Sequence, residues 1–466
     1  MQTQNIQLRS FRPPCSRPRR PPKAVRELVD ALLTPLVNAY PLAEIFWEAR
    51  HRSIIERDAS GRRTCTQEWV CGAQLRVVGE RVSAVSWTTD LTAQGLLRAF
   101  AGLGLRLNAP RLPDRVRQLT LKLDDAATLQ LRQVAAAELT TRAARRLSDT
   151  ARVRVEMDEY LRGSATALGR SRQWRGRQAL VSIELPRPDG SLLRRARVLE
   201  GTCGPEALRA SGLLADVRTA WAQAPHPAGE LAGRMPVVVA PGFGAILFHE
   251  LVGHSLEADH VLGGASPFAH CTYGQQVSHP ELTIVDSPQP EVGCGGLFVD
   301  DEGQTPVTVT LIDAGTIAGM LHDRVTATMV GAPSTGNGRR EDFRMEPQPR
   351  MRNLVVAPGP HSPDALRSDI RRGLYIERLA EGRADLASGC FTLTVEAGRR
   401  IQRGHLGAPV RGVLVRGNIR ATLAGIEGVG NDWQAAPDPV FCGKRGTVIT
   451  GVAGPTVRLG ELEVLS

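Results

Sequence analysis

The chain has 466 residues, of which 42% are hydrophobic and 23% charged, as in an ordinary soluble protein with room for two domains. It contains no apolar run of about 18 residues and no hydrophobic stretch typical of a secretory signal near its start, so we expect neither a membrane span nor export, and a cytoplasmic location. The net charge of +10 raises nucleic acid as a partner, but seven basic residues lie within residues 1–26, and the rest of the chain carries about +3.

The first 24 residues form a basic, proline-rich segment without hydrophobic periodicity. We predict a disordered tail at residues 1–24, and we treat nucleic acid as a disfavoured partner. The 8 cysteines are widely scattered and none forms a CxxC pair. We therefore expect free thiols, not a disulfide framework or a zinc ribbon.

Several later segments have the periodicity of helices or strands. Helices are predicted at residues 24–40, 92–104 and 126–147. Strands are predicted within residues 43–58, 70–78, 81–87, 151–158 and 178–185, with a turn around residues 59–61. This mixture of hairpins and helices predicts an α+β fold, not a regular βαβ series.

A domain boundary is predicted near residues 222–234, which are rich in Pro, Ala and Gly and lack periodicity. Beyond it lies a buried strand, MPVVVAPG, followed by one helix and then many short Val, Leu and Ile runs broken by Gly, Asn and Pro. We therefore expect an N-terminal α+β domain at residues 25–228. A β-rich C-terminal domain that carries the helix should cover residues 229–466.

That helix contains the residues with the clearest chemistry. The segment GFGAILFHELVGHSLEADH (242–260) places His249 next to Glu250, with His254 five residues after His249. Two imidazoles and a carboxylate on one short element are what a hydrolytic zinc ion requires. In this interpretation the histidines bind the metal, and Glu250 is the base that takes a proton from water. The alternative is that both histidines are ordinary helix residues that bind no metal.

The spacing HExxxH requires a distortion. Residues five apart lie about 140° apart around a regular α-helix, too far to bind one ion. One extra residue in a turn would bring both imidazoles to the same face, and such π-bulges are frequent at functional sites. We therefore predict a π-turn or kink at Leu251–His254, with Gly253 tolerating the distortion.

Catalytic zinc usually has three protein ligands, and the spacing alone leaves the third open. Glu257 and His260 lie in the same segment, and Cys442 lies in a glycine-containing turn, PVFCGKRGT, far along the chain. The chemistry of these residue types does not choose among them.

A series of motifs resembles the TldD/PmbA family, and specifically its catalytic TldD branch. In the family's order, the chain contains HELVGHSLEAD, DDEGQTPV (300–307), GAPSTGNGRRE (331–341), PQPRMRNLVVAPG (347–359), LASGCFTL (386–393), GVGNDW (428–433) and FCGKRG (441–446). The N-terminal half matches more loosely. The resemblance covers residues from about 25 to the C-terminus, and a collinear series of this kind is far more specific than any single motif.

The resemblance implies a zinc metallopeptidase. It implies that Zn²⁺ is bound by His249, His254 and Cys442, with Glu250 as the catalytic base. It argues against His260 as a zinc ligand. It also implies a heterodimer with a PmbA/TldE-type subunit, with a homodimer as the alternative. The implied substrates are unfolded or extended peptides, including precursors of ribosomally made peptides.

Two other segments have polar residues of interest. Asn337, Arg339 and Arg340 are predicted to line the substrate channel and hold a peptide carboxylate, and the alternative is a hairpin turn with surface arginines. The run at residues 300–303 is interpreted as a solvated turn in preference to a second cation site.

Two other function classes remain as alternatives. One is a catalytically silent scaffold that binds peptides or a partner, which the intact HExxxH and cysteine disfavour. The other is a nucleic-acid-associated regulator that uses the basic tail.

Overall fold

The computed structural model describes residues 15–79, 83–113, 118–123, 126–187, 190–199, 205–222, 226–227 and 231–465. Within these residues, the first half is built on a six-stranded antiparallel sheet with the order β3-β2-β1-β4-β5-β6. Its strands are β1 (Leu42–Arg57), β2 (Arg63–Val78), β3 (Ser83–Thr88), β4 (Arg152–Thr166), β5 (Ser171–Pro186) and β6 (Leu192–Leu199). β1 and β2 pair along their whole length, so the turn predicted around residues 59–61 is confirmed.

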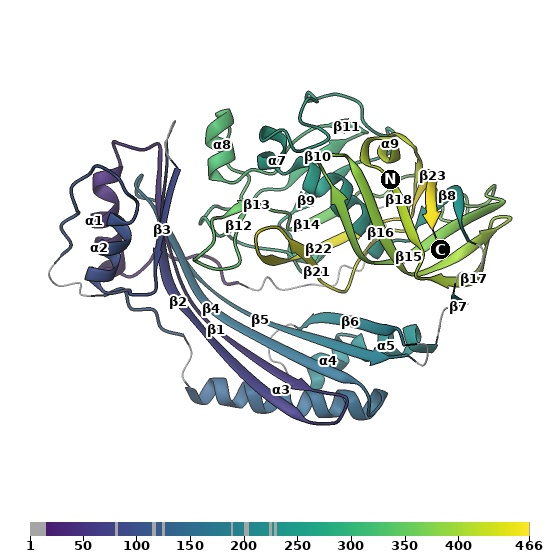
Figure 1. Cartoon of the computed structure of the whole chain (residues 1–466), viewed down its shortest axis with the longest axis horizontal. Coiled ribbons are helices and arrows are strands. Elements are labelled where there is room, and N and C mark those ends of the chain that lie inside the picture. Colours follow the sequence, from purple (N-terminus) through teal and green to yellow (C-terminus); the bar gives the residue numbers. More distant parts are fainter. Residues whose placement is uncertain are drawn as a thin grey trace, which may run out of the picture.

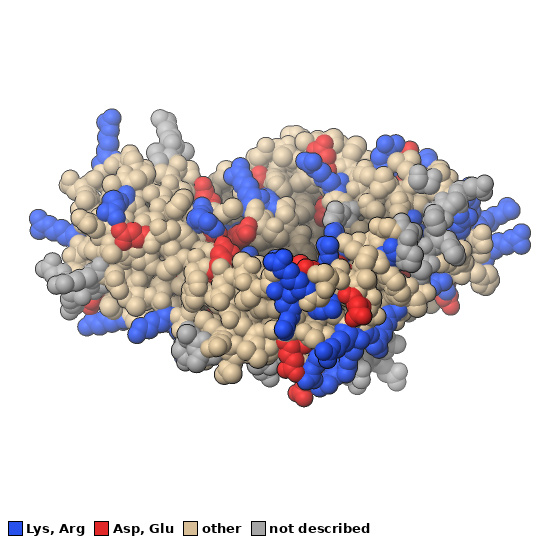
Figure 2. Space-filling view, turned by 60° about the horizontal axis from the view of Figure 1, so that its bottom comes forward, with Lys and Arg blue, Asp and Glu red and all other residues tan. Residues whose placement is uncertain are grey.

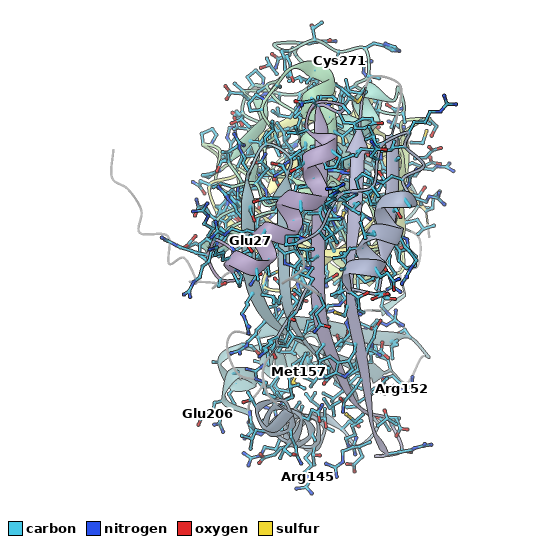
Figure 3. The ribbon with its side chains drawn as sticks, turned by 90° about the vertical axis from the view of Figure 1, so that its left-hand side faces the viewer. Glu27, Arg145, Arg152, Met157, Glu206 and Cys271 are labelled. Atoms are coloured by element: carbon cyan, nitrogen blue, oxygen red, sulfur yellow. The ribbon has the colours of Figure 1, made fainter. Side chains whose placement is uncertain are left out.

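Two groups of helices cover one face of this long, curved sheet, one at each end (Figure 1). They are α1 (Lys23–Leu33), η1 (Thr34–Leu36) and α2 (Ala93–Ala101) at one end, and α3 (Ala126–Leu147), α4 (Pro205–Ala210) and α5 (Leu213–Ala222) at the other. Figure 3 looks from the first end, with Glu27 of α1 in front, and Arg145 of α3 and Glu206 of α4 at the far end. α1 packs because its apolar residues recur at helical spacing, and these are Val25, Leu28, Val29, Leu32 and Leu33.

The other face of the sheet is also buried. Alternate residues of a strand point to opposite faces. In β1, Ile45 and Trp47 pack under the helices, whereas Phe46 packs against residues of the C-terminal half. The carboxylates of Glu44 and Glu48 also face that half, where they bind arginine or backbone groups. The concave face of the sheet thus supports the second half of the chain.

The second half packs two further sheets around one hydrophobic core. Among the described residues, an eight-stranded sheet contains β7 (His226–Pro227), β8 (Gly233–Val239), β15 (Arg372–Asp385), β16 (Cys390–Gln402), β17 (His405–Arg411), β18 (Leu414–Asn418), β19 (Ile426–Val429) and β23 (Val457–Leu465). A seven-stranded sheet contains β9 (Ile284–Ser287), β10 (Val309–Asp313), β11 (Thr316–Ile317), β14 (Asn353–Val356), β20 (Gln434–Ala435), β21 (Val440–Gly443) and β22 (Thr447–Gly454).

Shorter elements complete this half. They are the hairpin of β12 (Gly338–Arg339) and β13 (Gln348–Pro349), the turn η5 (Pro290–Val292), and the helices α8 (Arg324–Val330) and α9 (Ile419–Ala424). The expected α+β fold with a β-rich second half is confirmed. No helix within the described residues is both long enough and apolar enough to cross a membrane.

Two local expectations are wrong. The predicted disordered tail does not extend to residue 24, because Cys15 pairs with Gly176 and Arg19 with Gln173 alongside β5; residues 1–14 lie outside the described residues. The run at residues 300–303 is no solvated turn, because Asp300 and Glu302 are fully buried. The domain boundary predicted at residues 228–229 also lies outside the described residues and stays a prediction.

The surface carries charges of both signs. On the face shown in Figure 2, lysine and arginine side chains stand beside aspartates and glutamates around a central hollow. A face of this kind differs from the single-sign basic patch that is typical of a nucleic-acid interface.

Candidate metal centre

The segment after β8 is helical with several changes of hydrogen-bond pattern, and its last turn is separated from the rest by the extended backbone of Glu257. It runs through η2 (Phe243–Ala245), α6 (Ile246–Phe248), the π-turn η3 (His249–Gly253), η4 (His254–Leu256) and α7 (Ala258–Leu262). In the π-turn, the backbone N–H of His254 donates to the carbonyl of His249, five residues earlier. The predicted distortion is therefore confirmed.

The π-turn brings the two imidazoles together. The ring centroids of His249 and His254 are 5.0 Å apart and the rings lie at 85° to each other. On a regular helix, the same two side chains would point about 140° apart. The one-residue insertion thus converts a spacing that cannot bind one ion into a spacing that can.

Gly253 has a different role from the expected one. Its backbone has ordinary helical angles, φ −56° and ψ −60°, which any residue can adopt. A Cβ at this position would meet Sδ of the buried Met351 at 1.8 Å. The glycine is therefore required because the turn packs tightly against β14 and the residues that precede it, and not because the turn is strained.

Cys442 lies beside these histidines although it is far away in sequence. It belongs to β21, which pairs with β22 through Cys442 and Val448. Its Sγ lies 3.5 Å from Nε2 of His254, and one ligand atom from each of Cys442, His249 and His254 lies within 4.8 Å of the other two. Among the residues weighed as third ligand, Cys442 is the one that joins the two histidines.

The donor set fits a zinc ion. With Zn–N distances of about 2.0 Å and a Zn–S distance of about 2.3 Å, tetrahedral ligands would lie about 3.5 Å apart, as Sγ and Nε2 do. The buried Nδ1 of His249 has no hydrogen-bond partner within the described part of the chain. Two imidazoles and a thiolate leave a fourth position for water, as in catalytic zinc sites.

The electrostatics favour a thiolate at this point. Burial acts to raise the pKa of the Cys442 thiol, but the imidazoles of His254 and His249 outweigh burial and hold that pKa well below its usual value. The thiolate form is the form that binds metals. Cys294, also buried, has its thiol pKa raised by burial to about 12 and stays protonated.

A second layer of charges fixes His254. Its Nδ1 donates to the Glu257 carboxylate at 3.1 Å, which leaves Nε2 pointing at Cys442. Lys444 donates to Glu257 at 2.9 Å and to Asp259 at 2.7 Å. Burial acts to raise the pKa of Glu257, but the charges of His254 and Lys444 lower it to about 2, so Glu257 is ionised and holds the ring as carboxylates commonly do in metal sites.

The sequence indicated only part of this layer. Glu257 was weighed as a ligand, but it instead orients His254. His260, the other local candidate, turns its Nδ1 to the backbone carbonyl of His254 at 2.9 Å and does not join the ligand group. Lys444 was missed, although it follows the cysteine by two residues in the motif FCGKRG.

Glu250 lies in the same π-turn but faces a cleft. It makes no hydrogen bond or ion pair with any other residue that the structure describes. The cleft has a volume of about 680 Å³ and is bounded by Glu250 together with residues of β5, β6, β15, β16 and the segment 438–441. A free carboxylate next to the ligand group is suitably placed to act as a base.

The three remaining candidates lie elsewhere. Asn337 is fully buried and donates to Asp286 and to the backbone of Arg350. Arg339 and Arg340 are buried too and line a smaller cavity that shares no residue with the cleft beside Glu250. None of these three lines the cleft that Glu250 faces, and their role in holding a peptide carboxylate stays a prediction.

Comparisons with known proteins agree with this geometry. Residues 232–466 match the model of the PmbA/TldA metallopeptidase C-terminal domain. The metalloprotease TldD homolog of Haemophilus influenzae is 34% identical over 234 residues, which are 50% of this chain and 48% of that protein. The zinc metalloprotease TldD homolog of Saccharolobus solfataricus is 30% identical over 236 residues, which are 50% of this chain and 52% of that protein.

The fold extends the likeness to both halves. TldE from Thermococcus kodakarensis superposes with a TM-score of 0.67 at 14% identity, covering 95% of this chain and 100% of that one. The sequence matches span about half the length of the curated relatives. Because the matching domain makes up half of the chain and contains the two histidines and the cysteine, the chain belongs to the PmbA/TldD family of metallopeptidases.

Proposed function

We propose that this protein is a zinc peptidase of the HExxxH type that hydrolyses extended peptides. The observation that carries the proposal is the π-turn, which gathers His249 and His254 around the Cys442 thiol while Glu250 faces an open cleft. Zn²⁺ is the metal that this mixed imidazole and thiolate set prefers. The name of one curated relative includes zinc.

In this proposal each residue has one task. A zinc ion held by His249, His254 and Cys442 would acidify a water molecule and polarise the scissile carbonyl. Glu250 takes the proton from that water and returns it to the leaving amine. Glu257 and Lys444 keep His254 in the orientation and tautomer that leave Nε2 free to bind.

The shape of the cleft supports an extended peptide as substrate. β6 is the edge of the six-stranded sheet, and among the described residues it pairs only with β5. Four residues of β6 line the cleft that Glu250 faces, namely Leu192, Arg194, Arg195 and Ala196. An extended chain could add to such an edge through main-chain hydrogen bonds, which makes recognition weakly dependent on side chains.

A partner subunit and a cytoplasmic location are part of the same proposal. The fold is shared with a TldE protein, which supports a PmbA/TldE-type subunit as the partner and a second copy of this chain as the alternative. The cysteines that the structure describes are all free thiols, as expected in a reducing compartment. Precursors of ribosomally made peptides are one substrate class of suitable form.

The test is mass spectrometry of an unstructured peptide mixture incubated with zinc-loaded protein. Wild type is compared with Glu250→Gln, which keeps the size of the side chain but cannot take a proton. The matched control is Glu206→Gln, the same charged-to-neutral change at the exposed start of α4, at a residue that does not line the cleft. We expect wild type and Glu206→Gln to cleave, and Glu250→Gln to bind zinc normally but to cleave at least about a hundredfold more slowly.

Other outcomes would change the assignment. Equal cleavage by wild type and Glu250→Gln would exclude Glu250 as the base. If the wild-type chain alone cleaves no peptide, the assay is repeated with a PmbA/TldE-type subunit. If the complex binds zinc and peptide but still cleaves no peptide, the result would favour the scaffold function.

A further inference from the structure

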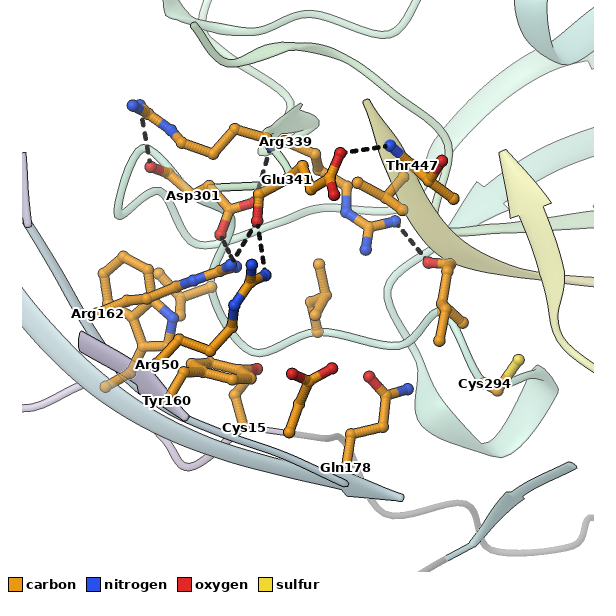
Figure 4. A pocket seen from close by; sticks show the side chains of 18 of the residues that line it. Cys15, Arg50, Tyr160, Arg162, Gln178, Cys294, Asp301, Arg339, Glu341 and Thr447 are labelled. Atoms are coloured by element: carbon orange, nitrogen blue, oxygen red, sulfur yellow. Dashed lines mark hydrogen bonds and ion pairs between the residues drawn. The ribbon is translucent and has the colours of Figure 1, made fainter. Parts of the chain in front are cut away.

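A second cavity lies between the two halves of the molecule, and the metal centre does not use it. Its volume is about 130 Å³. One wall is the concave face of β1, β4 and β5, and the other is formed by residues 339–341 together with β22 (Figure 4). It shares no residue with the cleft that Glu250 faces.

The wall of this cavity has an excess of positive charge. Five arginines and three carboxylates line it, namely Arg50, Arg52, Arg162, Arg339 and Arg340 against Asp158, Asp301 and Glu341. Three of the arginines have a carboxylate within ion-pair distance. Arg52 binds Asp158 at 3.0 Å, Arg162 binds Asp301 at 2.8 Å, and Arg340 lies 3.7 Å from Glu44.

Arg50 and Arg339 differ from the other three. Arg50 is 6% exposed and donates from Nη1 to the backbone carbonyl of Glu341 at 3.2 Å. Arg339 is 9% exposed and donates from Nη1 to the carbonyls of Met351 and Ile449, both at 2.9 Å. The Nε of each is buried without a hydrogen-bond partner, and neither forms an ion pair with a residue in the described ranges.

Two buried guanidinium groups without a direct ion-pair partner are costly, and the carboxylates that act on them, Asp301 and Asp286 on Arg339 and Asp342 on Arg50, do so from beyond ion-pair distance. Arginine stays protonated in proteins, so neither group escapes the cost by losing its proton. A buried charge needs a partner charge with hydrogen bonds. Asp158 and Asp301 are paired with Arg52 and Arg162, and Glu341, the remaining carboxylate of the wall, accepts from the backbone N–H of Thr447 at 3.1 Å (Figure 4). Among the described residues neither guanidinium has an ion-pair partner, and an anion bound in the cavity would supply one.

We propose that this cavity is a binding site for a small oxyanion, held by Arg50 and Arg339. Guanidinium groups bind the paired oxygens of phosphate and carboxylate with matching geometry. The small volume restricts the ligand to a single anionic group. Tyr160 and Gln178 line the same cavity and add a hydroxyl and an amide as neutral donors. The site is independent of the proposed peptidase chemistry.

The test measures the melting temperature of the full, zinc-loaded chain against increasing sodium phosphate, sodium acetate and sodium chloride at equal ionic strength. A ligand that binds only the folded state raises the melting temperature in a saturable manner. We expect saturation with phosphate or acetate and none with chloride. Saturation by phosphate alone identifies a phosphate-type ligand, and saturation by acetate alone identifies a carboxylate.

Variants separate this site from general salt effects. Arg50→Gln and Arg339→Gln are each expected to weaken binding of the anion at least about tenfold. The double variant should show no anion-dependent rise in melting temperature. Arg50→Lys keeps the positive charge and should retain part of the anion-dependent rise in melting temperature. The matched control is Arg399→Gln, because Arg399 is already paired with Glu377 at 2.9 Å and lies outside the cavity.

Two results would overturn the proposal. One is the absence of any saturable rise in wild type with either anion. The other is an equal rise in wild type and in the single Gln variants, and this comparison does not depend on the folding of the double variant. Peptide cleavage is measured in parallel, and its loss or retention bears on the peptidase proposal alone.

Discussion

His254 is held from two sides by two buried acidic groups. Its Nε2 faces the Cys442 thiol at 3.5 Å, and its Nδ1 donates to the buried, ionised Glu257 at 3.1 Å. Glu257 itself needs Lys444, because a carboxylate fully removed from water is costly without a counter-charge. Glu257, from the motif that contains His254, and Cys442 and Lys444, from the motif FCGKRG, thus act together on one imidazole.

We expect Glu257→Gln to weaken zinc binding by about ten- to a hundredfold, as loss of an orienting carboxylate typically does. The neutral amide no longer raises the basicity of His254, and among the described residues it leaves Lys444 with Asp259 as its one charged partner. Competition with a chromophoric zinc chelator measures this affinity. An affinity equal to that of wild type, with Glu206→Gln as the control, would show that Glu257 does not position the ligand.

Two buried cysteines provide a matched pair. Cys442→Ser is expected to lose most bound zinc, because the thiolate is one of three ligands. Cys294→Ser should keep a full complement, because the Cys294 thiol is protonated and donates to the carbonyl of Thr450 at 3.3 Å. Metal content per chain after dialysis against a weak chelator distinguishes the two. Equal zinc content in both variants would exclude Cys442 as a ligand.

At the scale of elements, the π-turn depends on a close contact between Gly253 and Met351. Gly253→Ala is expected to lower the free energy of unfolding by about 1–3 kcal/mol, because the added methyl group overlaps Met351 Sδ. It should also weaken zinc binding, since His254 follows directly. Urea unfolding and the chelator titration measure the two effects.

A second substitution tests the cause of this effect. Met351→Ala removes the side chain that the new methyl group meets, so the double variant should lose less stability than the two single changes added together. Strict additivity would mean that Gly253 is required for its backbone and not for the space around it. The ordinary φ and ψ of Gly253 argue for space.

Local elements could be predicted from the sequence because their signals are local. The Ala-, Leu- and Arg-rich composition of residues 126–147 indicated α3, and the residues around 59–61 indicated the turn between β1 and β2. The HExxxH spacing even required the π-turn, because no regular helix satisfies it. The pairing of Glu257 with Lys444 was out of reach, since it depends on how β21 packs against α7 and η4, 187 residues away.

At the scale of the whole molecule, the burial of charged residues on the concave face of the sheet was the main feature that could not be predicted from the sequence. Glu44 and Glu48 alternate with apolar residues in β1, a pattern that is typical of a strand with one face in water. In the structure they are 2% and 0% exposed, because the C-terminal half covers that face. Residues 300–303, expected to form a solvated turn, are buried for the same reason, because they contact Arg76 of β2 and Arg162 and Ser164 of β4.

This interface contains a network of buried ions that joins the two halves. Arg76 of β2 binds Glu44 at 2.8 Å and Glu302 at 2.5 Å, and Glu302 also accepts the backbone N–H of Arg324. Burial is the largest cause that raises the pKa of Glu302, to about 8, with Asp323 and Glu44 adding to it against the opposing charge of Arg76. Attachment of the two halves is therefore expected to depend on pH.

The sign follows from the direction of the shift. In the unfolded chain a glutamate has a pKa of about 4.3, so between about pH 4.3 and pH 8 the folded state binds more protons than the unfolded state. The free energy of unfolding then falls as the pH rises through this window, by at most about 1.4 kcal/mol per pH unit for one group. Asp300, whose pKa burial raises to about 7, contributes in the same direction.

Glu302→Gln tests this linkage. The amide keeps the shape of the side chain and its acceptor oxygen but has no proton to lose, so the decline in stability between pH 5.5 and pH 8.5 should become shallower in the variant. Urea unfolding at four pH values within that range measures it, with Glu206→Gln as the exposed control. Parallel curves for wild type and Glu302→Gln would mean that Arg76 keeps Glu302 ionised throughout. The coupling between the halves would then be a permanent ion pair, and its strength would not change with pH.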